Sequence, residues 1–93
     1  MSDFDDTIEQ MEIIKRSVGE DATSQINQAI QSLQEAGETR PLRDKADLLE
    51  VAAKKLKGIE ELPPQQQSEI EDIAKRLSDC AVAILDARDR FLR

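Results

Sequence analysis

Histidine is absent from this sequence of 93 residues, and its absence removes most of the common catalytic and metal-binding motifs. Without histidine there can be no Ser-His-Asp triad, no Cys-His pair, and no zinc or di-iron site that uses imidazole ligands. The three glycines lie too far apart to form a phosphate-binding loop. We therefore predict that the protein is not an enzyme, and that it holds no cofactor and no metal ion.

Cysteine is almost absent as well. The single thiol, Cys80, cannot form a disulfide framework, and its apolar neighbours predict that it is a small buried side chain. The longest apolar run, residues 80–85, is far shorter than the roughly 20 residues that span a bilayer. The first residues are acidic, where a signal peptide would be positively charged. These features predict a cytoplasmic protein that has no membrane partner.

Aromatic residues are scarce, because the chain has two phenylalanines and neither tryptophan nor tyrosine. Runs that alternate polar and β-branched residues are also missing, so the sequence predicts no β-strand. A chain of 93 residues makes one small helical domain, residues 1–93, which buries roughly 60–65% of its unfolded surface. Stability must therefore come from aliphatic packing between helices, supplemented by oligomerisation.

The clearest pattern that is present lies near the C-terminus, where apolar residues recur at alternating gaps of three and four. The members of this seam are Ile70, Ile73, Leu77, Cys80, Ile84, Ala87 and Phe91. A heptad repeat of this kind predicts one long amphipathic helix over residues 64–92. Pro64 suits the first position of that helix, although a capping box formed by Ser68 and Glu71 offers a later start.

The middle of this helix predicts self-association. Residues 80–85 are apolar on every side of the helix, and such a segment must be covered all round. At 1.5 Å per residue the helix spans roughly 43 Å and outruns the helix before it, which spans roughly 28 Å. We therefore expect a homodimer whose interface includes Cys80, Val82, Ile84 and Leu85, with Ile84 at the centre of the seam.

Glycine and proline divide the rest of the chain. Gly37 predicts the end of one helix as a C′ glycine, and Pro41 predicts the first position of the next, which runs to about Ile59. Ser2 or Asp3 can cap the first helix. The connections are short, which predicts antiparallel neighbours.

Two arrangements fit the first 36 residues. Ser17 and Glu20 have the spacing of a capping box, which favours a break near Ser17 and a second helix after it. Alternatively, one continuous helix runs over residues 3–36, because the step from Val18 to Ala22 to Ile26 is a stutter that a helix can absorb. In either case the predicted core positions are Phe4, Ile8, Met11, Ile14, Val18, Ala22, Ile26, Ala29, Leu33 and Ala36.

Charge is distributed unevenly along the chain. The first 39 residues hold nine acidic and two basic residues, so the whole net charge of −7 lies there. Residues 40–57 are net basic, and we expect their lysines and arginines to pair with the acidic helices. The N-terminal acids Asp3, Asp5, Asp6, Glu9 and Glu12 form the candidate surface for a basic partner.

Together these features predict an all-α antiparallel bundle of three or four helices with a long C-terminal helix. The predicted function is binding to another protein, as an adaptor, inhibitor or regulator of a basic partner. A structural homo-oligomerisation module is one alternative, and an acidic DNA mimic that blocks a nucleic-acid-binding protein is another. Direct binding to nucleic acid is not expected, because no basic stripe with aromatic residues is present.

Overall fold

The structure, a computed structural model, describes residues 4–91, and 84% of that part of the chain is helical. Its elements are α1 (Asp5–Lys15), α2 (Glu20–Glu38), α3 (Leu42–Lys57) and α4 (Pro64–Phe91). The described residues contain no strand. The predicted all-α fold with a long C-terminal helix is therefore confirmed.

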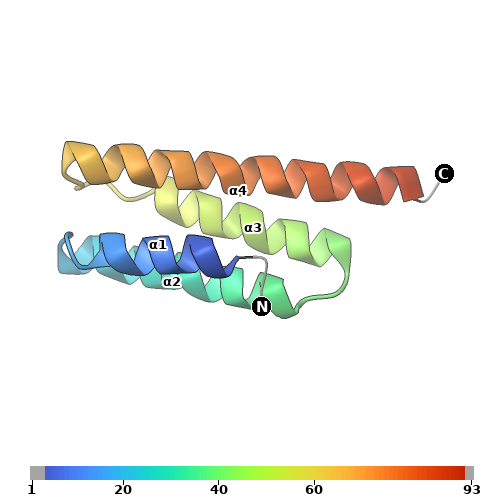
Figure 1. Cartoon of the computed structure of the whole chain (residues 1–93), viewed down its shortest axis with the longest axis horizontal. Coiled ribbons are helices and arrows are strands. Elements are labelled where there is room, and N and C mark those ends of the chain that lie inside the picture. The colour runs from blue at the N-terminus through green and yellow to red at the C-terminus, as the bar shows by residue number, and fades with distance from the viewer. Residues whose placement is uncertain (1–3, 92–93) are drawn as a thin grey trace.

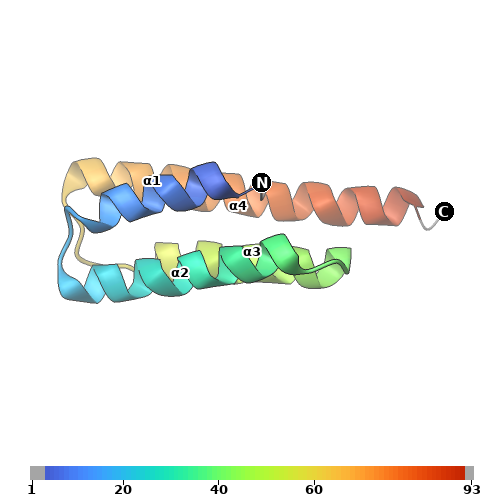
Figure 2. The same cartoon turned by 60° about the horizontal axis from the view of Figure 1, so that its bottom comes forward.

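The four helices form an antiparallel bundle in which each helix reverses the direction of the one before it (Figure 1). α3 packs closely against both α2 and α4, whereas α1 makes fewer close contacts with α2 and α4. α1 covers only the first half of α4, and the second half of α4 continues past it (Figure 2). The bundle is therefore elongated, with principal extents of 46 × 22 × 17 Å.

The chain breaks between α1 and α2, as one of the two arrangements predicted. The predicted capping box, however, is wrong, because α2 begins at Glu20 with Gly19 at the N-cap position and no side-chain cap hydrogen bond. The predicted stop at Gly37 is wrong as well, because α2 continues through Gly37 to Glu38. The helix ends where Thr39 becomes extended ahead of the Arg40-Pro41 dipeptide, which itself disfavours helical backbone.

The later boundaries lie close to the predicted ones. Pro41 occupies the N-cap position of α3 rather than its first turn, and α3 ends at Lys57 with Gly58 as its C-cap. α4 begins at Pro64, not at the alternative start near Ser68. The predicted caps Ser2 and Asp3, and the predicted last helical residue Leu92, lie outside the described residues.

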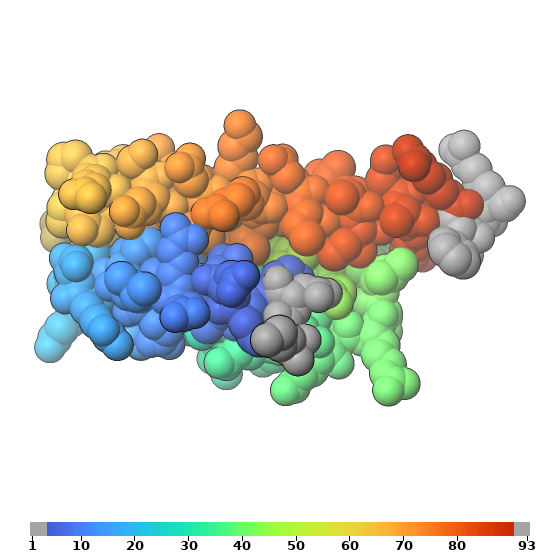
Figure 3. Space-filling model, viewed as in Figure 1, coloured from blue at the N-terminus to red at the C-terminus, as the bar shows by residue number. Residues whose placement is uncertain are grey.

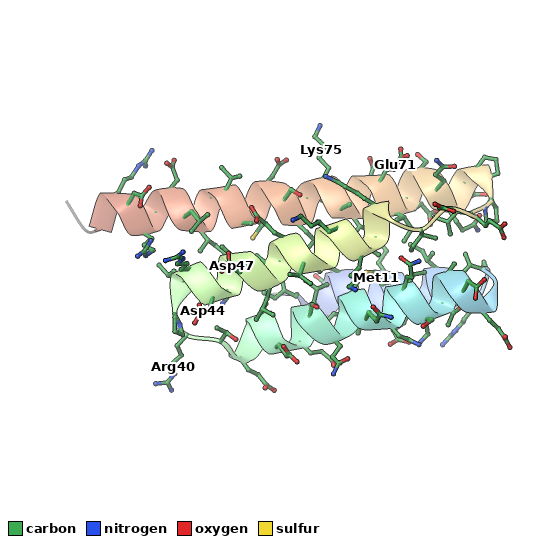
Figure 4. The ribbon with its side chains drawn as sticks, turned by 180° about the vertical axis from the view of Figure 1, so that it is seen from behind. Met11, Arg40, Asp44, Asp47, Glu71 and Lys75 are labelled. Atoms are coloured by element: carbon green, nitrogen blue, oxygen red, sulfur yellow. The ribbon has the colours of Figure 1, made fainter. Side chains whose placement is uncertain are left out.

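Aliphatic side chains and alanines fill the core. The large residues with almost no exposed surface are Met11, Ile26, Leu33, Leu49, Leu56, Ile70 and Ile73. Met11 points into the bundle, while Glu71 and Lys75 point away from it (Figure 4). Ile70, Ile73 and Leu77 of the predicted seam are buried. The seam missed Ala74 and Ala81, which are also buried and which widen the buried stripe of α4.

The C-terminal half of the predicted seam is less well covered than its first half. Cys80 and Ile84 are only half-buried and Ala87 is exposed, so Ile84 does not lie at the centre of the core. Leu42, at the start of α3, has 40% of its surface exposed. The reason is that α1 does not reach this end of the bundle, where α4 passes beyond it (Figure 3).

Burial at three depths predicts three different costs for truncating an isoleucine. Ile73→Ala removes a fully buried side chain and should lower the free energy of unfolding by about 2–5 kcal/mol. Ile84→Ala, which is half-buried, should cost roughly 1–2 kcal/mol, and Ile13→Ala, whose side chain is exposed, less than about 0.5 kcal/mol. Urea denaturation followed by circular dichroism measures all three, and equal losses would contradict this order of burial.

A buried alanine at a contact between helices should be sensitive to enlargement of its side chain, whereas the isoleucines are sensitive to truncation. Ala74 has no exposed surface, so Ala74→Leu has no space for its side chain and should destabilise the bundle by about 1–3 kcal/mol. The matched control is Ala87→Leu on the same helix, where the side chain is exposed and the change should stay within about 0.5 kcal/mol. Thermal unfolding distinguishes the two variants, and a neutral Ala74→Leu would disprove close packing at this contact.

Candidate interaction surfaces

The outer face of α1 carries the predicted partner-binding acids. Asp5 and Asp6 lie in the first turn, where negative charge is favoured by the helix dipole. Asp5, Glu9 and Glu12 are four and three residues apart, so they share one side of the helix. The buried residues of α1 lie on the other side, and the acids are exposed or partly exposed. Asp3, the fifth predicted acid, lies outside the described residues.

An apolar side chain lies among these acids. Ile13 directly follows Glu12 and is four residues after Glu9, and 57% of its surface is exposed. Lys15, one turn further along α1, pairs with Glu12 at 2.9 Å and also donates a hydrogen bond to Asn27 of α2 at 2.9 Å. The outer face of α1 therefore offers exposed carboxylates beside one exposed isoleucine.

The predicted self-association residues are not grouped on one exposed surface. Cys80, Ile84 and Leu85 are partly buried and pack against the core of their own protomer. Val82 lies on the other side of α4 from Cys80 and Ile84, and 62% of its surface is exposed. One exposed valine presents far less area than the ~800 Å² per partner of a typical stable interface.

The basic residues of α3 do not pair with the neighbouring acidic helices as expected. In the described part of the chain, no ion pair joins the bases of α3 to the acids of α2 or α4. Lys54, Lys55 and Lys57 are exposed instead, near the C-terminus of α3, where positive charge suits the helix dipole. Lys45 lies 5.8 Å from the centre of the Phe4 ring, which places a cation over the aromatic face.

One end of the bundle carries an acidic hollow that the sequence did not predict. The start of α2 and the connection from α3 to α4 meet there and enclose an open hollow of about 850 Å³. Its charged lining residues are Glu20, Asp21, Glu60 and Glu61, with no basic side chain among them. These two acidic pairs lie 40 residues apart in the sequence, so no local pattern could reveal that they meet.

Acidic side chains are numerous within residues 4–91. This part of the chain contains no group of three or more acidic or cysteine side chains placed to hold a metal ion. No helix of the same part is both long enough and apolar enough to cross a membrane.

Comparison of the chain with known protein families, with curated proteins and with solved structures finds no match.

Proposed function

We propose that the protein acts in the cytoplasm by binding another protein, and that the outer face of α1 docks on a basic surface of this partner. The observation that supports the proposal is the mixture of groups on that face. Carboxylates at Asp6, Glu9 and Glu12 precede Ile13 along the helix, and the Ile13 side chain is 57% exposed. Acidic side chains steer a basic partner toward the helix, and an isoleucine buried on contact contributes to holding it there.

The biochemical role that suits such a surface is that of an adaptor, an inhibitor or a regulator. The acids project from a helix whose other side is anchored by Phe4, Met11 and Ile14, all buried. Because the helix is held by the bundle, the acids keep a fixed spacing, and little conformational freedom is lost when a partner binds. A partner whose basic residues follow a helical spacing fits this surface best.

Self-association is the second part of the proposal. A small bundle with a thin core gains stability as a homodimer. The exposed Val82 on α4 favours the alternative of a structural oligomerisation module, but it offers only one apolar side chain to a second copy. The proposed dimer therefore needs more contact area than the outer face of α4 provides.

Charge reversal tests the role of the α1 acids. In the variant, lysine replaces Asp3, Asp5, Asp6, Glu9 and Glu12. The buried side of α1 is untouched, so the protein should fold with a loss of about 0.3–1 kcal/mol for each site nearest the N-terminus. We expect this variant to lose a basic partner captured from the native host by the wild-type protein. Binding of that partner to the wild type, measured by surface plasmon resonance, should weaken as salt rises.

The matched control reverses five acids elsewhere, with the same change in net charge: Glu60, Glu61, Glu69, Glu71 and Asp72. This control should keep most of the affinity for the partner. Equal losses in both variants would mean that overall charge, not the α1 face, governs binding. If the partner binds DNA and DNA displaces the wild-type protein from it, the α1 acids act as a phosphate mimic.

A further inference from the structure

At both ends of the connection between α1 and α2, the backbone φ angle is one that a helix uses. Arg16, which ends α1, has φ −72° and ψ −17°, both in the right-handed helical region. Gly19 has φ −73°, which a helix also uses, and departs from a helix only in its ψ of 172°. Rotation of ψ at Gly19, together with rotation of the backbone at Ser17 and Val18, would join α1 and α2 into one helix.

Backbone hydrogen bonding favours that joined helix locally. α2 begins without a side-chain cap, so the first amides of α2 have no capping side chain to bond. In a continuous helix, the amides of residues 19–22 would donate to the carbonyls of residues 15–18. In the closed hairpin the Lys15 carbonyl instead accepts a hydrogen bond from the Thr23 hydroxyl, at 3.3 Å across the turn.

The side chains agree with both forms of the connection. Ile14, Val18 and Ala22 follow each other at steps of four, so the apolar seam of α1 continues into that of α2 without a polar interruption. No proline lies in residues 1–40, and Gly19 is the residue of the connection with the lowest helix propensity. The connection is therefore compatible with a closed hairpin and with an open, straight helix.

Tertiary packing keeps a single copy closed. Phe4, Met11 and Ile14 are buried in the bundle, and opening would expose them together with the surface of α2 and α4 that they cover. A lone chain has nothing else to place there. The one segment that is certain to fit this surface is α1 itself, and a second copy of the chain brings another α1.

We propose that two copies of the chain associate by exchanging α1. In this dimer residues 5–38 of each copy form one continuous helix, and α1 of each copy packs between α2 and α4 of the other. Every core contact of the closed protomer is made again across the two copies, and the connection gains helical hydrogen bonds. The inference rests on the proposed self-association and specifies its structure, with Phe4, Met11 and Ile14 of each copy buried against the other.

Electrostatic repulsion opposes this dimer and makes its association constant depend on salt concentration. The turn between α1 and α2 lies at the end of the bundle that carries the acidic hollow (Figure 1). Exchange brings these ends of two copies together, so Glu20, Asp21, Glu60 and Glu61 of one copy approach the same residues of the other. Salt screens repulsion between exposed charges, so dimerisation should strengthen as salt rises. Binding to a basic partner has the opposite dependence on salt.

Two substitutions in the connection shift the equilibrium in opposite directions. Gly19→Ala has free space for its Cβ and favours the continuous helix, by about fivefold for each of two connections, so the association constant should rise roughly 25-fold. Glu20→Pro suits the first position of α2 after an extended Gly19, but blocks a helix that passes through it. It should leave only monomer, even though it removes a repelling charge. Gly37→Ala, within α2 in both forms, is the control and should not change the association constant.

Cross-linking identifies which copy supplies α1. Gln10 of α1 accepts a hydrogen bond from Arg76 of α4 at 3.3 Å, so cysteines at these two positions lie within reach of a short thiol-reactive cross-linker. The variant Gln10→Cys, Arg76→Cys, Cys80→Ser is refolded at high protein concentration and separated by size-exclusion chromatography with light scattering. After cross-linking, denaturing electrophoresis should show two chains joined covalently in the dimer fraction. In the monomer fraction it should show single chains whose two cysteines are linked to each other.

Three results would overturn the exchange. They are links within one chain in the dimer fraction, a Glu20→Pro dimer as abundant as that of the wild type, and no dimer from either the wild type or Gly19→Ala. The first two would show that self-association uses another surface and would leave the proposed homodimer standing. The third would contradict both the exchange of α1 and the proposed homodimer, and would leave the proposed binding of a basic partner unaffected. Circular dichroism confirms that each variant keeps its helical content, so a misfolded variant is not counted as a monomer.

Discussion

Close approach of three helices through alanine is the constraint on which the rest of this structure depends. The chain has almost no aromatic residues with which to fill space between helices, so the helices themselves must come close together. α3 contributes Ala46, Ala52 and Ala53 to the core, and each has no more than 2% of its surface exposed. α1 contains no alanine and packs through larger side chains. α1 is therefore held by fewer close contacts than the other three helices.

Most of the fold could be predicted from the sequence because its signals are periodic and local. The heptad seam located α4, and Pro64 marked its first residue correctly. The errors arose where two local rules competed. Glycine is common at the end of a helix, yet α2 continues past Gly37 to Glu38. It ends where the backbone becomes extended ahead of Pro41. The seam also missed Ala74 and Ala81, because small residues carry little weight in a hydrophobic pattern although they mark the closest contacts.

The surfaces were predictable only where they depend on one helix. The α1 acids could be placed together from their spacing, because residues three and four apart share a helical face. The acidic hollow could not, because it joins the start of α2 to the connection after α3. Pairing between the basic and acidic helices was expected from their opposite charge, but the register of α3 directs Lys54 and Lys55 to solvent. Net charge along a sequence does not specify which side of a helix carries it.

The short length of α1 divides the bundle into two unequal ends. α1, α2 and α4 all reach the end that holds the α1–α2 turn, whereas the start of α3 and the last turns of α4 lie beyond the reach of α1 (Figure 2). Leu42 and Ile84 are correspondingly less buried than Leu56 and Ile70 at the other end. Amide hydrogen exchange should therefore follow a gradient along the long axis, with protection falling toward the C-terminus of α4. Thermal fluctuations should therefore be larger at the end that α1 does not reach, although α4 runs along the bundle without a break.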